Sequence, residues 1–477
     1  MVMSKYDAII IGAGIGGLTC ALLLAKKGVR VAVFEKEKLP GGYCSSFSKD
    51  GYVFDACVDS IGGLRKNEPL RNIMEEDLGI WNEVDFYELN PIHRNLFPGM
   101  SIDIPADINQ YKDTLKSIFV SEKKGIDETF FLMEEIYTSS VEIMCDTAAG
   151  GRLLEFIDKS FYDLLSSFIS DVKLKAVLSS YCTFLGLPAH EASAIALSNI
   201  LMHYVKGGAF RVRGGIQGLS NALASALKNY GGELFLGEEV TRILSHGRSV
   251  TGIVTKSGHK ANAAHIVSNI DLKTVLMLIE GQVVEQKRAE KIKELEVSGS
   301  FVLVYLGVKD SLRGYGLTSS TGYFSSYDLN GMLNKNEHIF FGLSFPSLFD
   351  SSVAPKGCSS LVIHWPFCYN ESRPEILKDK IGKTLIGHLC KVIPSIADQI
   401  AYKSVAGPET LQRYTGNTFG SAYGWKQDAI FLKNLPFLKN LANNFHLAGH
   451  WAGYGGGVMS SVLSAYRVAK DIIKEEG

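Results

Sequence analysis

The sequence lacks an excess of charge of either sign, and it lacks any long apolar run. Its 49 basic and 50 acidic residues leave a net charge of −1. Nucleic-acid-binding domains usually carry a basic excess, so we expect no nucleic-acid partner. No apolar run reaches the roughly 18 residues of a membrane-spanning helix, and the first run, Ala8–Ile11, is too short for a signal peptide. The sequence therefore predicts neither a spanning helix nor export.

Spacings that would bind a metal or form a redox dithiol are also missing. The eight cysteines include no C-x-x-C pair, so the sequence predicts no metal site and no dithiol centre. Scattered cysteines in a long chain are typical of a reducing compartment, and we expect a cytoplasmic location. No serine–histidine–acid arrangement or pair of catalytic carboxylates stands out, so the sequence assigns no catalytic side chain.

A strand–turn–helix pattern with a glycine-rich turn opens the chain. Tyr6–Ile11 is a short apolar, β-branched run, as in a buried parallel strand. The turn GAGIGG spans 12–17, and the apolar helical pattern after it ends at Gly28. Val29–Phe34 predicts a second strand, with Glu35 at its end. This order of elements is the fingerprint of a dinucleotide-binding βαβ unit.

Each residue type in this fingerprint has a physical role. Gly12 permits the tight turn out of the strand, Gly14 lets the backbone approach a pyrophosphate, and Gly17 allows the helix to pack close to the sheet. The helix then directs free N–H groups and the positive end of its dipole at the phosphates. Glu35 accepts hydrogen bonds from ribose hydroxyls and disfavours a 2′-phosphate. The predicted cofactor contacts in this unit are Gly12, Gly14, Ile15, Gly16, Gly17 and Glu35.

The segments that follow resemble one group of flavoproteins. A glycine pair, Gly41 and Gly42, is followed by GYVFD, which contains Phe54 and Asp55. This stretch resembles the phytoene desaturase superfamily of FAD enzymes, which includes carotenoid desaturases, carotenoid isomerases and retinol saturases. The resemblance implies that the glycine pair lets the chain pass close to the flavin side of FAD. Tyr43 stands where many related amine oxidases have arginine, which disfavours amine-oxidase chemistry.

Later segments extend the resemblance. The stretch that begins at Gly207 resembles the family at Gly214 and Gly215, and a strand and a hairpin then return the chain to the FAD domain. The resemblance implies that Val240 contacts adenine through its backbone N–H and C=O groups. The stretch from Gly407, GPETLQRYTGNTFGSAYGW, resembles carotenoid isomerases and retinol saturases more than ordinary desaturases.

The final segment is predicted to complete the cofactor site. A strand ends at Leu447, a turn begins at Gly449, and a glycine run leads into the last helix near Val458. The resemblance implies that Gly449, Gly457 and Val458 contact FAD, with the helix start stabilising negative charge near the flavin. The residues predicted to lie in the substrate pocket are Tyr43, Tyr423, Trp425, His450 and Trp451.

The expected fold class is α/β: a two-dinucleotide-binding, Rossmann-like FAD domain interleaved with an α+β substrate domain that carries a helical cap. We assign residues 1–70, 207–285 and 438–477 to the FAD domain, and residues 71–206 and 286–437 to the substrate domain. In the helical cap, residues 153–169 place apolar side chains on one helical face, which suits a packed core, the wall of an apolar tunnel or a surface that dips into a bilayer.

The resemblance implies FAD-dependent chemistry at the C=C bonds of a hydrophobic polyene or isoprenoid lipid, by isomerisation, saturation or desaturation. Burial of such a chain stabilises binding by roughly 0.8 kcal/mol per CH₂ group, and such substrates reside in membranes, so we expect peripheral contact with a bilayer. Only one dinucleotide site is evident, so NAD(P)H would act as a transient reductant. Two alternatives stay open: a flavin amine oxidase, and a non-catalytic prenyl- or lipid-binding protein on the same fold. The sequence leaves the oligomeric state open.

Overall fold

The first of two large sheets contains the predicted dinucleotide unit. The computed structural model describes residues 4–145, 151–333, 339–367 and 378–476. The first sheet has seven strands in the order β10-β2-β1-β13-β12-β11, with β19 also paired to β13. Their bounds are β1 (Ser4–Ile11), β2 (Val31–Glu35), β10 (Glu233–Leu236), β11 (Val240–His246), β12 (Ser249–Thr255), β13 (Lys260–Ser268) and β19 (Phe445–Leu447). Strands β10, β2, β1, β13 and β19 run parallel to one another, as the glycine fingerprint requires, whereas β12 is antiparallel to β13.

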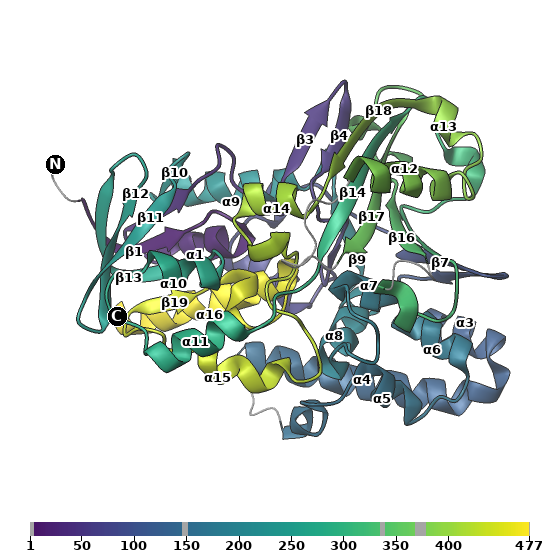
Figure 1. Cartoon of the computed structure of the whole chain (residues 1–477), viewed down its shortest axis with the longest axis horizontal. Helices are drawn as coiled ribbons and strands as arrows, with labels where there is room; N and C mark the ends of the chain where they lie inside the picture. Colours follow the sequence, from purple (N-terminus) through teal and green to yellow (C-terminus); the bar gives the residue numbers. More distant parts are fainter. Residues whose placement is uncertain (1–3, 146–150, 334–338, 368–377, 477) are drawn as a thin grey trace.

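Helices cover both faces of this sheet because β1 is apolar on both faces. Ala8 and Ile10 belong to one buried cluster, whereas Ile9 and Ile11 belong to another. The first cluster joins β1 to helices α1 (Ile15–Lys26), α9 (Gln217–Asn229) and α16 (Val458–Glu476). The second joins it to α10 (Leu272–Leu278), α11 (Gln286–Glu294) and α15 (Leu435–Leu438). Figure 1 shows this sheet and its helices together on the left.

The second large sheet is mostly antiparallel and lies at the upper right of Figure 1. Its order is β18-β14-β17-β16-β15-β7-β8. The bounds are β7 (His93–Phe97), β8 (Met100–Ile104), β14 (Ser300–Val308), β15 (Ser320–Phe324), β16 (Phe340–Ser344), β17 (Ser359–Phe367) and β18 (Ile400–Ala406). The short helices α12 (Lys378–Leu389), α13 (Ile396–Gln399) and α14 (Pro408–Thr415) belong to this part of the chain.

The fold also contains two small sheets, one of two strands and one of three. Strands β3 (Ser46–Lys49) and β4 (Tyr52–Asp55) form a hairpin. Strand β9 (Ala209–Val212) pairs with both β5 (Ile61–Gly62) and β6 (Phe86–Glu88). The strands of the first sheet therefore come from three separate stretches of the chain, as expected for an interleaved α/β fold. The domain boundaries assigned from the sequence stay a prediction.

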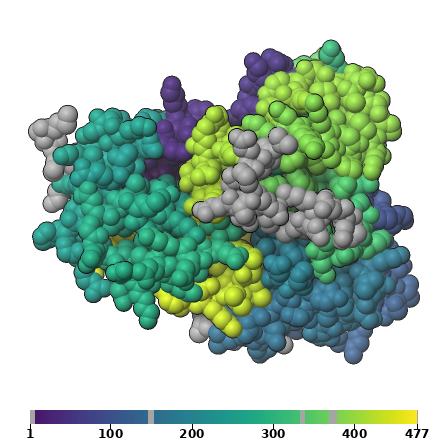
Figure 2. Space-filling model, viewed as in Figure 1, coloured from purple at the N-terminus to yellow at the C-terminus, as the bar shows by residue number. Residues whose placement is uncertain are grey.

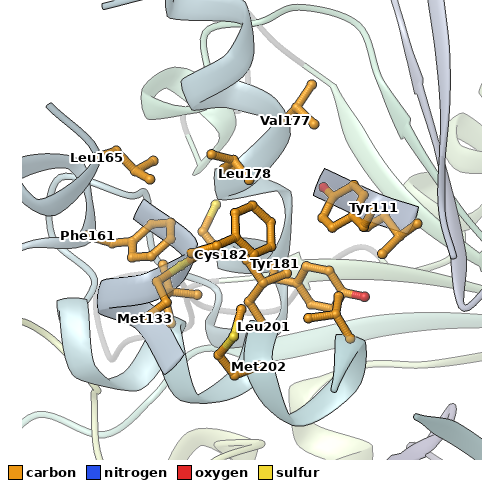
Figure 3. Packing of buried hydrophobic residues seen from close by; sticks show 14 of the residues in the cluster. Tyr111, Met133, Phe161, Leu165, Val177, Leu178, Tyr181, Cys182, Leu201 and Met202 are labelled. Atoms are coloured by element: carbon orange, nitrogen blue, oxygen red, sulfur yellow. The ribbon is translucent and has the colours of Figure 1, made fainter. Parts of the chain in front are cut away.

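The predicted helical cap forms a separate apolar core. Its helices are α3 (Ile108–Ile118), α4 (Lys123–Met144), α5 (Phe161–Ser166), α6 (Val172–Leu178), α7 (Cys182–Leu185) and α8 (Ala194–Val205). Figure 3 shows the side chains of Tyr111, Met133, Phe161, Tyr181 and Leu201 packed together between these helices. Large buried aromatic and aliphatic side chains of this kind hold the helices at fixed positions. The short α2 (Pro69–Asn72) instead packs with the first sheet's helices through Leu70.

The continuous helical face predicted for 153–169 is wrong, because the segment is broken in two. A short 3-10 turn ends at Phe156, and α5 begins only after Ser160. The Ser160 hydroxyl accepts a hydrogen bond from the Asp163 N–H, and the Asp163 carboxylate accepts one from the Ser160 N–H. This capping box starts a new helix in the middle of the apolar run.

The surface divides into the same regions, and Figure 2 shows them as teal, green and blue lobes that meet around the yellow carboxy-terminal residues. Across the described ranges, no helix is long and apolar enough to cross a membrane. The cysteines within these ranges are free thiols, and Cys368 lies outside them.

Candidate cofactor and substrate site

A large cavity extends from the glycine turn of the first sheet to the helical cap and the second sheet. Its volume is about 1580 Å³. Pockets for one small ligand are usually about 300–1,000 Å³. The cavity therefore has room for a dinucleotide and a second ligand together.

The glycine turn after β1 brings three backbone segments into close contact. A Cβ atom on Gly17 would lie 2.1 Å from the Gly12 carbonyl oxygen, and one on Gly16 would lie 2.8 Å from the Gly449 Cα. Gly12 itself has a φ of +95°, which side-chain-bearing residues rarely adopt. The turn can therefore form only with glycine at these positions, and it leaves bare backbone facing the cavity.

Glu35 lies at the carboxyl end of β2 and faces the same turn. Its Oε2 accepts a hydrogen bond from the Ala13 N–H at 2.7 Å, and its Oε1 accepts one from the Glu37 N–H at 2.9 Å. Burial raises the pKa of Glu35, although the two N–H groups act in the opposite direction. A carboxylate has about four lone-pair sites, so two stay available for the hydroxyls of a ribose.

Asn269 is a residue of this site that sequence reasoning missed. It follows β13, and a Cβ on Gly14 would lie 2.8 Å from its Nδ2, while one on Gly449 would lie 2.1 Å from its Oδ1. Its amide thus fills the space that the glycines leave between the first and last turns. The sequence could have indicated Asn269, because it directly follows β13, a strand parallel to β1, and ligands bind at the carboxyl ends of such strands.

The residues assigned to FAD from the sequence collect at this end of the cavity. The wall includes Gly12, Gly14, Ile15, Gly16, Glu35, Gly41, Gly42, Val240, Gly457 and Val458. Gly17 and Gly449 lie behind the wall, in the close backbone packing described above. The bare turn, the free lone pairs of Glu35 and the helix starts at Ile15 and Val458 fit FAD, and their contacts with it stay a prediction.

Three of the predicted pocket residues, Tyr43, Tyr423 and His450, also line the cavity. The Tyr43 hydroxyl donates to the Ser421 carbonyl at 2.7 Å, and the Asn417 Nδ2 lies 3.5 Å from the His450 Nε2. Burial lowers the pKa of His450 to about 4 and raises the pKa of the Tyr43 hydroxyl. Both side chains are therefore uncharged near neutral pH.

The structure does not bring Trp425 and Trp451 to the cavity wall, although the sequence assigned them to the pocket. Both are completely buried, with their ring centroids 4.9 Å apart. The Trp451 Nε1 donates to the Asn417 Oδ1 at 3.1 Å, and the Trp425 Nε1 donates to the Trp451 carbonyl at 3.1 Å. The two indoles thus support Asn417, and through it His450, from behind.

Apolar side chains of the helical cap form much of the remaining wall. They include Val141, Met144, Phe184, Leu185, Ile195 and Ile200. The run 153–169 is divided between the cavity wall and the core. Leu153 and Ile157 line the cavity, whereas Phe161 and Leu165 belong to the core of the helical cap. A wall of this composition favours an apolar ligand.

Sequence reasoning also missed a group of polar side chains on this wall. Asp59, His93, Ser320 and His364 line the cavity beside the apolar residues. They come from four segments that are far apart in the chain, and no local motif marks them.

A glycine-rich βαβ turn with an acid at the end of the second strand defines a dinucleotide-binding oxidoreductase fold. The family model described as "Flavin containing amine oxidoreductase" matches residues 15–473. The chain therefore belongs to this family, and the curated relatives below place it with the phytoene desaturase-like members.

Three curated relatives cover most of the chain. Prolycopene isomerase 1 from an Oncidium hybrid cultivar is 27% identical, over 98% of this chain and 84% of its own length. The 1-hydroxycarotenoid 3,4-desaturase of Flavobacterium sp. is 25% identical, over 98% of each chain. All-trans-retinol 13,14-reductase of Danio rerio is 25% identical, over 89% of this chain and 78% of its own length.

Solved structures show the same fold. Putrescine oxidase bound to putrescine aligns with a TM-score of 0.69 and 16% identity, over 99% of this chain and 100% of that one. The predicted fold class is thus confirmed.

Proposed function

We propose that this chain is an FAD-dependent enzyme that acts on the C=C bonds of a hydrophobic polyene or isoprenoid lipid. The cavity carries the proposal, because one space joins the predicted FAD site to an apolar wall. Relatives named as an isomerase, a desaturase and a reductase of polyenes support this substrate class.

The two helix starts on the cavity wall suit the phosphates of FAD. Helix α1 begins at Ile15 and α16 begins at Val458, and both residues line the cavity. Free N–H groups at a helix start, with the positive end of the dipole, favour negative charge. Glu35 would hold the ribose. FAD would supply the hydride or electron transfer, while the chain binds and orients the reactants.

The side chains beside the predicted flavin position suit an uncharged substrate. Tyr43 and His450 are neutral, and their hydrogen bonds to the Ser421 carbonyl and to Asn417 hold them in place. Because neither side chain is charged, a hydrocarbon can enter without removing water from a charged group at these two positions. Burial of the hydrocarbon against the helical cap supplies the binding, at roughly 25 cal/mol per Å² of apolar surface.

Purified FAD-loaded protein would be incubated with a panel of cis-polyenes and, separately, with a panel of amines. The products would be separated by chromatography, and hydrogen peroxide would be measured. We expect conversion of a polyene and no peroxide from amines. Peroxide release with amines, without polyene conversion, would instead identify an amine oxidase. Failure of the purified protein to retain FAD, together with binding of polyenes without conversion, would identify a lipid-binding protein.

The reductant is tested in the same assay. We propose that NAD(P)H acts only transiently, so its addition should reduce the flavin without a stable complex. Gel filtration after mixing should recover FAD but no nicotinamide with the protein. Recovery of bound nicotinamide would contradict this part of the proposal.

A further inference from the structure

A charged pair lies beside the apolar part of the cavity wall. Asp59 lies between β4 and β5 and lines the cavity, with 14% of its side chain exposed. Arg211, in β9, pairs with it from behind and has 3% of its side chain exposed. Apolar and aromatic residues line the same cavity, among them Phe184, Tyr204, Phe340 and Leu343. A pure hydrocarbon would cover the remaining lone pairs of Asp59 without donating a hydrogen bond to them, which costs binding free energy.

The charges of the pair balance each other. The Arg211 Nη2 contacts the Asp59 Oδ1 and donates to the Ser344 hydroxyl at 2.7 Å. The Ser320 hydroxyl donates to the Asp59 Oδ2 at 3.0 Å. Burial acts to raise the pKa of Asp59, but Arg211 and the surrounding donors hold it below its usual range. Asp59 is therefore an ionised carboxylate whose charge is already matched.

The neighbouring imidazoles add no charge. Burial lowers the pKa of His93 to about 4 and also lowers the pKa of His364. The His93 Nδ1 lies 2.9 Å from the Ser320 hydroxyl. The His364 Nε2 has no hydrogen-bond partner among the described residues. The cluster is thus electrically neutral as a whole near pH 7.

The hydrogen-bonding capacity of Asp59 selects the kind of group that fits. An ionised carboxylate only accepts hydrogen bonds, and about three of its roughly four lone-pair sites are used by Arg211, Ser320 and Ser344. A ligand must therefore donate. A carbonyl or an ether has no proton to give, an anion would be repelled by Asp59, and a cation would disturb the balance of charge with Arg211. A neutral hydroxyl is the group that meets these conditions.

We infer that Asp59, held by Arg211 and Ser320, binds a hydroxyl group on the apolar substrate. The substrate class is then a hydroxylated polyene or isoprenoid rather than a plain hydrocarbon. This inference rests on the proposed function, because it assumes that the apolar half of the cavity holds the substrate chain. The hydroxyl would fix how far the chain enters the cavity and hence which double bond lies near the cofactor.

The test compares four probes with one chain length: geranylgeraniol, its methyl ether, the aldehyde and the amine. Dissociation constants would be measured on the FAD-loaded protein by calorimetry and by changes in flavin absorbance. We expect the alcohol to bind about tenfold more tightly than the ether, as for one hydrogen bond to a charged group. The aldehyde should bind like the ether, and the amine should bind no more tightly than the alcohol.

The variant Asp59→Asn should bring the alcohol-to-ether ratio close to one while the ether still binds. Asp103→Asn is the matched control, because Asp103, on β8, pairs with Arg94, on β7, and neither residue lines the cavity. This control should keep the wild-type ratio. The double variant Asp59→Leu with Arg211→Met should also lose the preference, and it avoids leaving Arg211 as an unpaired buried charge.

Equal binding of alcohol and ether to the wild type would overturn the inference, as would a preference that survives in Asp59→Asn. Tightest binding of the amine would overturn it too, in favour of a cation site. Each of these results leaves the proposed function standing, because the chain still binds. Failure of alcohol and ether alike to bind the FAD-loaded protein would contradict the proposed function itself.

Discussion

The two halves of the cavity are built in different ways. The cofactor end consists largely of backbone and glycine, much of it from consecutive residues of β1, the turn and α1. The far end consists of side chains, with Asp59, Arg211, Ser320 and His364 drawn from distant segments. A site made of consecutive backbone leaves a motif in the sequence, whereas a site made of scattered side chains leaves none. The two halves should therefore respond differently to substitution.

The largest expected effect is at the cofactor end. Gly14→Val should reduce the flavin content of the purified protein to background, because the new side chain would occupy the space needed by a pyrophosphate and press on Asn269. Flavin would be released by denaturation and quantified by absorbance. The fold should persist, since the Gly14 Cβ would meet the flexible end of the Asn269 side chain rather than backbone.

A glycine in an open position is the control for this variant. Gly387 lies in α12 with no atom within 4 Å of the position of its Cβ. Gly387→Val should retain the full flavin content. A normal flavin content in Gly14→Val would show that this turn does not bind the cofactor.

At the far end, the expected effect is on stability rather than on flavin. Asp59→Leu leaves Arg211 as an unpaired buried charge, which should lower the free energy of unfolding by about 3–5 kcal/mol. Adding Arg211→Met should recover most of this loss, since a well-packed apolar pair replaces the ion pair at little cost. Urea unfolding of the three proteins would measure both effects, with flavin content followed in parallel.

The double variant also tests whether the two halves of the cavity are independent of each other. We expect the double variant to bind as much flavin as the wild type, because the hydrogen bonds of the pair go to Ser319, Ser320 and Ser344, and none of these is a predicted FAD residue. If the double variant were stable but free of flavin, the two halves would be coupled rather than independent.

A smaller effect is expected from acid. Burial lowers the pKa of His203, on the α8 side of the cavity, from 6.5 to about 3. The unfolded chain then binds more protons between these values, so the stabilising contribution is complete above about pH 6.5 and falls with pH below it. His203→Gln should reduce the loss of stability between about pH 7 and pH 5.5 by about 1 kcal/mol.

Urea unfolding at the two pH values measures this difference. His190→Gln, at an exposed histidine, is the control for the substitution itself. An unchanged slope in His203→Gln would mean that this histidine is not held neutral by burial.

Most of the first sheet could be predicted from the sequence. Buried parallel strands read as short apolar runs, and the predicted strands at Tyr6–Ile11 and Glu233–Leu236 are present as β1 and β10. The predicted helix start near Val458 is also confirmed by α16. The break before α5 was missed because the apolar spacing continues through Ser160, and the capping box outweighs it locally.

The candidate site was only partly predictable. Tyr43 and His450 could be placed because they adjoin glycine motifs, and both line the cavity. Trp425 and Trp451 adjoin the same motifs but lie behind the wall, since motif position does not say which way a side chain points. Asp59 and Arg211 could not be paired from the sequence, because β9 and β5, the short strand just after Asp59, are far apart in the chain and pair only in the folded sheet.

The most direct test of the central claim is the product formed from a cis-polyene by the anaerobic, FAD-loaded protein, with the flavin reduced in one assay and oxidised in a second. Ala196→Trp, which would fill the apolar part of the cavity from α8, serves as a blocked control. We expect a product altered at a double bond in one of the two assays, and the blocked variant should lose this conversion. An isomerase would give an unchanged mass with a new retention time. A saturase would add two hydrogens in the assay with reduced flavin, whereas a desaturase would remove two hydrogens and pass them to the oxidised flavin. A polyene recovered from both assays of the wild-type protein with its mass and retention time unchanged would contradict the proposed function.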